Sequence, residues 1–349
     1  MTMNKKGIEM QFHWIFILIA GAIILAFFFS MAYKQKALST QKLELTLATD
    51  IENIITTALI SKETAQRIPI PTQGLNFDCT EFCDCAFNID GAQKTIIQPI
   101  FAPEEITGTE AVLWTKAFNL PYRVTNFLYI YSPETKYYFI PTDQNANVQL
   151  LQPITTNIPP LINYEIINPE EISQQINSDY ENTYFVYFTG EQNYQPQPVH
   201  RSFENAKALV INQNFVQFYK KDRNNFQLIK VRPYFNQATI YAAMFSKDDI
   251  MYECGLKNAF NKLAIISQVY AERAKKLEQQ LVNSGKVWCT YGQCQNQATI
   301  VGQLCQQKQI AEQLSQQLNQ QELAQLQTIQ QTLLTANQNF ARNSCTELF

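Results

Sequence analysis

The sequence predicts an α+β protein: an N-terminal transmembrane helix continues into an amphipathic helix, followed by an antiparallel β-rich middle and a C-terminal long antiparallel helical hairpin. Three features predict this: an uncharged apolar run near the start, aromatic and β-branched segments in the middle, and a leucine stripe in the last third. The expected parts are a short N-terminal tail (1–11), a transmembrane anchor (12–33), an amphipathic stalk helix (34–68), a β-rich subdomain with a cysteine cluster (69–160), an α+β subdomain (161–246) and the helical hairpin (247–349).

The anchor is predicted from the apolar run over residues 14–33, which contains no charged residue. Its length matches a hydrocarbon core of about 30 Å, and Trp14 and Tyr33 stand at its ends, where amphipathic rings favour the interface. A cleaved signal peptide is the alternative, but it requires a shorter apolar region followed by small residues. The run ends in Phe27, Phe28 and Phe29 instead, so we expect a retained signal anchor.

The stalk helix is predicted from an apolar stripe with the period of a helix. Leu43, Leu47, Ile51, Ile54 and Ala58 recur at spacings of three and four residues, and the prolines from residue 69 onward end the pattern. An exposed stripe of this length would aggregate. We therefore expect it to be buried on the protein's own domain.

The middle of the chain is predicted to be mostly strands. Residues 122–131 and 136–140 read as a β-hairpin around a turn at 132–135. Prolines at 153, 159 and 160 indicate an internal boundary there. A short helix is expected from Pro169, and the strands predicted after it cover residues 183–189, 207–212, 215–220, 226–231 and 238–245.

The last third is predicted to be helical. Ser246 and Asp248 offer N-caps for a first helix that ends at Ser284-Gly285. A second helix continues through a leucine stripe as far as Phe340, with a glutamine-rich outer face. Two such helices predict an antiparallel hairpin.

Eight cysteines, all located after the anchor, indicate the compartment. An even set on one side of a membrane is what an oxidising exterior permits, whereas a cytosolic domain would keep thiols free or metal-bound. We expect disulfides, and hence a domain outside the cytoplasm, from Cys79, Cys83, Cys85, Cys254, Cys289, Cys294, Cys305 and Cys345.

The cluster Cys79-x-x-x-Cys83-x-Cys85 is the densest chemical motif. The disulfide interpretation requires one local bond and one cysteine tied to another element. The metal alternative is zinc or an iron–sulfur cluster held by these three thiolates, with Cys254 as a fourth ligand. For the helical hairpin, we expect a disulfide between Cys345 and Cys254, because antiparallel helices bring the start of one near the end of the other.

Catalysis and nucleic-acid binding are disfavoured by composition. The net charge is −3, which gives no basic face for phosphates. Besides His13 at the membrane edge, only His200 is available as a general base, and no hydrolase, phosphate-loop or dinucleotide motif occurs. The adjacent acid pairs beginning at Glu104, Glu170 and Asp248 are interpreted as acids at helix starts. We predict no enzyme and no cofactor.

The chain resembles two families. The segment starting Met10-Gln-Phe-His-Trp, the Cys79–Cys85 cluster, the run Leu120-Pro-Tyr-Arg-Val-Thr-Asn-Phe-Leu, and the ending Ser344-Cys345 resemble uncharacterised single-pass membrane-anchored ectodomain proteins of small-genome archaea. That family has no assigned activity, so the resemblance implies location and no functional residues.

The second resemblance is to type IV pilin-like proteins. Lys5-Lys6-Gly7 before an apolar helix looks like a prepilin peptidase site, which implies cleavage after Gly7. Phe12 stands where that family has its fifth-position glutamate, and Glu9 lies at the second mature position. The helical C-terminus is also foreign to a pilin head.

These features together predict a non-enzymatic protein of the cell envelope, single-pass in the cell membrane, with a disulfide-braced ectodomain and a structural or adhesive role. The expected partners are the lipid bilayer and either other envelope proteins or a neighbouring cell surface, with no nucleic acid. A pilin-like subunit is one alternative. A membrane-anchored enzyme or ligand-binding module without a recognisable site is the other.

Overall fold

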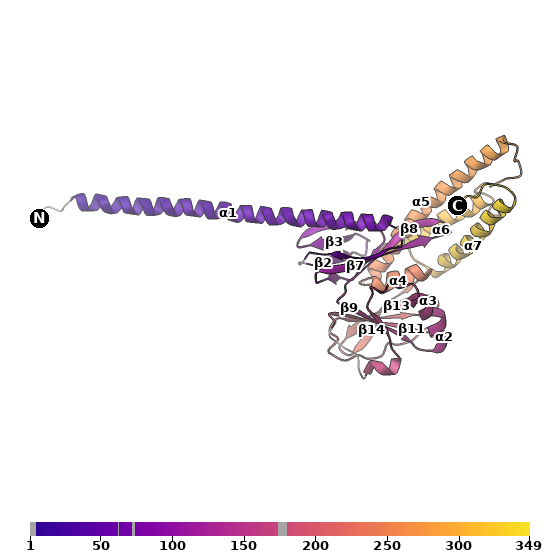
Figure 1. Cartoon of the computed structure of the whole chain (residues 1–349), viewed down its shortest axis with the longest axis horizontal. Helices are drawn as coiled ribbons and strands as arrows, with labels where there is room; N and C mark the ends of the chain where they lie inside the picture. The colour runs from indigo at the N-terminus through magenta and orange to yellow at the C-terminus, as the bar shows by residue number, and fades with distance from the viewer. Residues whose placement is uncertain (1–4, 62, 72–73, 174–179) are drawn as a thin grey trace.

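The computed structural model describes residues 5–61, 63–71, 74–173 and 180–349, and it has the shape of a rod, a head and an arm (Figure 1). The rod is helix α1 (Lys5–Ile60), whose 56 residues span about 84 Å at about 1.5 Å per residue. Within it, Phe16–Gln35 is long and apolar enough to cross a membrane and is not buried by the rest of the protein. The first four residues of the predicted tail and the side chains of residues 5–15, including His13 and Trp14, lie outside the described part.

The head contains three sheets. The first four-stranded sheet has the order β1 (Ala65–Pro69), β7 (Glu110–Asn119), β8 (Arg123–Tyr131), β5 (Ile100–Phe101). The second has the order β4 (Ala92–Ile96), β3 (Cys85–Ile89), β2 (Leu75–Cys79), β6 (Glu105–Ile106). The six-stranded sheet has the order β10 (Tyr164–Ile166), β9 (Thr135–Pro141), β11 (Asn182–Phe188), β12 (Ala206–Ile211), β13 (Phe215–Asp222), β14 (Asn225–Pro233).

Helices connect the sheets and form the arm. Between β9 and β11 lie α2 (Gln144–Ala146), the π-turn η1 (Asn147–Leu151), α3 (Gln152–Thr155) and the 3₁₀ turn η2 (Pro169–Ser173). Then follow α4 (Gln237–Phe245), α5 (Asp249–Asn283), α6 (Ile300–Gln316) and α7 (Gln320–Arg342). The mixed α+β class is confirmed, although the six-stranded sheet is only partly antiparallel: β10, β9, β11 and β12 run parallel. Residues 174–179 of the short helix expected after Pro169 lie outside the described part.

The predicted hairpin over residues 122–131 and 136–140 is wrong. Strand β8 pairs antiparallel with β7, whereas β9 belongs to the six-stranded sheet. The turn after Tyr131 carries the chain from one sheet to the next. The chain therefore passes from the first sheet to the six-stranded sheet at residues 132–134, and the boundary predicted near residue 160 lies in the connection between β9 and β10, two strands of the six-stranded sheet.

The strand predicted over residues 238–245 is helix α4. The Asn236 side chain caps it by accepting from the Thr239 backbone N–H, and the Thr239 hydroxyl accepts from the Asn236 N–H in return. Every residue from Ala238 to Phe245 is buried. A helix that is buried on all sides shows no polar face, so its apolar run cannot be told from a buried strand by periodicity.

The stalk helix ends at Ile60, earlier than the predicted residue 68, and β1 follows it. Its last turns pack on β3, β4, β7 and β8, and they bury Ala48, Ile51, Ile55 and Ala58. Leu43 from the predicted stripe is exposed instead. The Lys94 ammonium on β4 lies 2.8 Å from the Glu52 carboxylate and adds an ion pair to this contact.

A buried asparagine holds the end of the stalk. The Asn126 side chain on β8 donates to the carbonyl of Leu59 in the last turn of α1 at 2.8 Å, and to that of Ser61 just after the helix at 2.6 Å. The Arg123 guanidinium in turn donates to the side-chain amide oxygen of Asn126 at 2.8 Å. This amide fixes where the rod leaves the head.

The arm contains three helices in place of the predicted two. Asp248 caps α5, and α5 ends at Asn283, both as predicted. The predicted second helix is divided by Gln317–Asn319 into α6, which packs on α5, and α7, which packs on α6. Asn319 caps α7 by accepting from the Glu322 N–H at 3.0 Å. The leucine stripe continues across the break, because Leu314, Leu318 and Leu323 are all buried.

Replacing the stalk amide should loosen the rod. We expect Asn126→Ala to lower the free energy of unfolding by about 1–3 kcal/mol, since it removes the donor to the Leu59 carbonyl and leaves the Ser61 carbonyl only the 3.5 Å bond from Arg123. Chemical denaturation of the full chain in detergent measures this, and protease cleavage between residues 60 and 65 should accelerate. Asn53→Ala, at an exposed position of the same helix, is the matched control. Equal stability of the two variants would contradict this role of Asn126.

Candidate functional site

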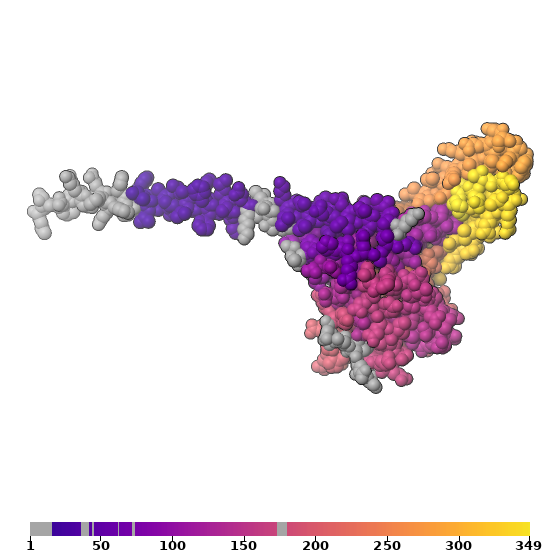
Figure 2. All heavy atoms as spheres, viewed as in Figure 1, coloured from indigo at the N-terminus to yellow at the C-terminus, as the bar shows by residue number. Residues whose placement is uncertain are grey.

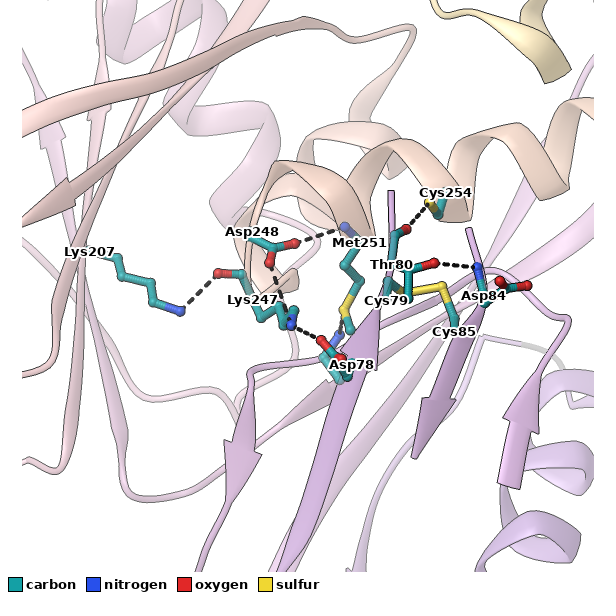
Figure 3. Close-up of polar contacts among 11 residues, drawn as sticks. Asp78, Cys79, Thr80, Asp84, Cys85, Lys207, Lys247, Asp248, Met251 and Cys254 are labelled. Carbon is teal, nitrogen blue, oxygen red and sulfur yellow. Dashed lines mark hydrogen bonds and ion pairs between the residues drawn. A yellow bond between two sulfur atoms is a disulfide. The ribbon is translucent and has the colours of Figure 1, made fainter. Parts of the chain in front are cut away.

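The predicted cysteine cluster forms the joint between the head and the arm (Figure 3). Cys79 and Cys85 are bonded across the paired ends of β2 and β3. Cys83, in the turn between these strands, is bonded to Cys254 on α5, 171 residues away in the sequence. One bond is local and the other reaches a second element, as the disulfide interpretation requires. All four sulfurs of the zinc or iron–sulfur alternative are thus engaged in disulfides.

An ion-pair cluster completes the joint beside these sulfurs. The Lys247 ammonium binds the Asp78 carboxylate on β2 and lies 3.6 Å from that of Asp248, which caps α5 by accepting from the Met251 N–H at 2.9 Å. Lys207 on β12 donates to the Lys247 carbonyl at 2.8 Å. Burial disfavours the charged ammonium, but the bond to Asp78 and the two carboxylate charges outweigh it and raise the pKa of Lys247. The joint therefore connects both sheets to the start of the arm.

The far end of the arm has its own pair of disulfides. Cys289 is bonded to Cys345, and Cys294 is bonded to Cys305. The expected bond between Cys254 and Cys345 is wrong. Because the second helix is divided, α6 returns toward the head and α7 carries the chain outward again, so Cys345 lies at the far end and Cys254 at the joint (Figure 1).

The connection between α5 and α6, residues 284–299, is held in one conformation; we call it the tip loop. The Glu278 carboxylate accepts from the N–H groups of Tyr291 at 2.7 Å and Gly292 at 2.9 Å. The Tyr291 ring is buried and stacks on Phe340 with centroids 4.3 Å apart. Gly292 has φ +87°, and a Cβ there would lie 2.3 Å from Thr299. These contacts and the two disulfides order a loop that has no secondary structure of its own.

The tip loop displays apolar side chains to solvent. Trp288 is 61% exposed and Val287 is 62% exposed, and Val282 on the adjoining turn of α5 is 43% exposed. Val282 also lines an open hollow of about 690 Å³, together with residues of α5 such as Lys275 and of the loop such as Gln293. Figures 1 and 2 show this end of the arm pointing away from the head, on the side opposite the N-terminal rod. Trp288 was not singled out in the sequence, because exposure cannot be inferred from one residue in a loop.

A second hollow lies where the six-stranded sheet meets the joint. Its two adjoining parts have volumes of about 300 and 340 Å³ and share Glu104, Tyr184, Lys207 and Lys220 in their linings. The acid pair at Glu104 borders this hollow and leads into strand β6, so its interpretation as a helix start is wrong. The pairs at Glu170 and Asp248 do stand at helix starts.

His200 lies in an exposed turn, where its Nδ1 is 3.0 Å from the Ser202 hydroxyl. No carboxylate among the described residues is placed to orient it as a general base. Comparison with known proteins adds no further assignment: no family model, no curated protein and no solved structure matches the chain.

The two disulfides of the joint should differ in their effect on stability. In the chain-entropy model, closing 171 residues is worth about 5 kcal/mol and closing six about 2 kcal/mol. We therefore expect the double variant Cys83→Ala with Cys254→Ala to lose about 3 kcal/mol more than Cys79→Ala with Cys85→Ala, measured by denaturant unfolding without reductant. A larger loss of unfolding free energy in the Cys79/Cys85 variant would contradict the role of the Cys83–Cys254 bond as the main brace of the joint. Metal that copurifies with the chain would contradict the disulfide assignment.

Proposed function

We propose that the chain is a non-enzymatic, membrane-anchored protein of the cell envelope that binds a partner through the tip loop. The observation that carries the proposal is the exposed Trp288 and Val287 on a loop braced by two disulfides, at the end of the molecule opposite the anchor. The partner would be another envelope protein or a component of a neighbouring cell surface.

Rigidity supports a binding role for this loop. A tryptophan on a backbone braced by disulfides loses less conformational entropy when a partner covers it than one on an unbraced loop, and tryptophan is enriched among residues that dominate binding energy. A loop kept only for connecting two helices requires neither two disulfides nor an exposed indole. The four disulfides also support the exterior as the location of the domain.

Adhesion should depend on the indole. Proteoliposomes carrying the full chain are incubated with native envelopes or cells of the source organism, and binding is measured by flow cytometry. We expect Trp288→Ala to reduce binding at least roughly tenfold, since truncating a dominant tryptophan typically costs about 2 kcal/mol or more. Phe82→Ala is the matched control, because Phe82 is 90% exposed in the turn at the joint. Undiminished binding of the Trp288 variant, or an equal loss for the control, would refute the proposal.

A pilin-like subunit is the second candidate. It is favoured by one continuous helix, α1, that is apolar in its first half and packed on strands in its second. In that case the mature chain should begin at Ile8, after cleavage behind Gly7, and N-terminal sequencing of protein from native membranes measures this. An intact Met1 would exclude the candidate and leave the anchored envelope protein.

A further inference from the structure

Strand β14 is an open edge of the six-stranded sheet. It is the last strand in the sheet order, nine residues long, and pairs with β13 on one side only. At its end, Arg232 is held by Asp249 at 2.8 Å and by Glu253 at 2.5 Å on α5. Between residues 226 and 231, no described element pairs with its outer side. The other edge of this sheet, β10, has only three residues.

The open part of β14 is apolar to an unusual degree for an edge. Leu228 is 45% exposed, Ile229 50% and Val231 41%. An edge with free backbone N–H and C=O groups and exposed β-branched side chains is a template for pairing with another strand, and proteins normally protect such edges. Here the described residues contain neither a covering helix nor a proline before Pro233, and the protection present is a bulge at Ile229 and the charge of Lys230.

The charge around this edge is opposite to that of the chain. Between residues 215 and 233 there are five cations and one carboxylate, whereas the whole chain has a net charge of −3. Lys220 and Lys230 are exposed and no ion pair binds them among the described residues. A strand added here would therefore meet a positive field along its length.

The hollow beside the edge provides room for a side chain. The part with a volume of about 300 Å³ is lined by Ile229 and Lys220 together with Phe218, Leu209 and Ile250. It thus combines apolar walls with a cation at its border. A strand lying along β14 would place alternate side chains on this face of the sheet.

We propose that β14 binds an extended, acidic segment of a partner protein, which pairs with the edge as a seventh strand. Its backbone would supply the missing hydrogen bonds. Its apolar residues would cover Leu228 and Val231, which lie on the side of the sheet that carries Tyr219, and its carboxylates would face Lys220 and Lys230 on the other side. A second copy of this chain does not fit, since two β14 edges would bring two positive hairpins together. This surface is distinct from the tip loop.

The test uses a synthetic peptide of about ten residues with alternating Glu and Val, the length of a strand, and the full chain in nanodiscs. Fluorescence anisotropy should show saturable binding that weakens with salt, and hydrogen exchange should slow at the amides of residues 226–231. A peptide with Lys in place of Glu should not bind. Lys230→Glu should weaken binding roughly fivefold, within the range of an exposed ion pair. Lys276→Glu, an exposed lysine of the arm, and Trp288→Ala should leave it unchanged.

Absence of binding, binding without protection of β14, or equal binding of the lysine peptide would overturn the proposal. Protection of β14 that rises with protein concentration in the absence of peptide would also overturn it and assign the edge to a second copy. Because Trp288→Ala tests only the tip loop, failure of either surface leaves the other one standing.

Discussion

The packing of helix α4 between the first four-stranded sheet and the six-stranded sheet is the contact on which the rest of the molecule depends. The Tyr241 ring packs against Trp114 of the first sheet, with ring centroids 4.7 Å apart. The Phe245 ring packs against Tyr137 of the six-stranded sheet, with ring centroids 5.4 Å apart. The Tyr129 hydroxyl donates to the Ala238 carbonyl at 2.8 Å, so the buried phenol is not left without a partner. Aromatic pairs of this kind add about 0.5–1.5 kcal/mol each beyond the area that they bury. The helix therefore fixes one sheet relative to the other and determines where α5 begins.

Helix α5 follows α4 in the sequence and connects the head to the arm. The 35 residues of α5 extend about 52 Å, and its first turns receive contacts from three directions: the Cys83–Cys254 disulfide, the Lys247 cluster, and Arg232 of β14. Such a base leaves the arm few ways to bend relative to the head. The tip loop and the β14 edge are thus connected through the base of α5, which links the two surfaces for which binding roles are proposed.

Local signals in the sequence were sufficient for some of this structure and not for the rest. The cap at Asp248 and the end of α5 depend on neighbouring residues, and both were predictable. The pairing of Cys83 with Cys254 depends on which strands and helices meet, and eight cysteines permit 105 pairings. The same limit explains the misassigned hairpin, since the residues after Tyr131 have the composition of a turn whether the next strand joins the same sheet or another. Strand β14 is an edge because of the order of the strands in the sheet, and no local sequence pattern predicts that order.

Disulfides at the joint and at the tip each lie beside a turn that exposes a large aromatic side chain. At the joint, Cys83 belongs to a turn whose Phe82 is 90% exposed, and at the tip Cys289 follows the exposed Trp288. Burial holds part of each turn, since Cys254 at the joint and Tyr291 at the tip are buried, and the covalent bonds add to this packing. Disulfides form and persist mainly in oxidising compartments. At the tip they order the backbone beside the exposed Trp288. The oxidising chemistry that is compatible with a domain outside the cytoplasm therefore also braces the loop on which the proposed binding role depends.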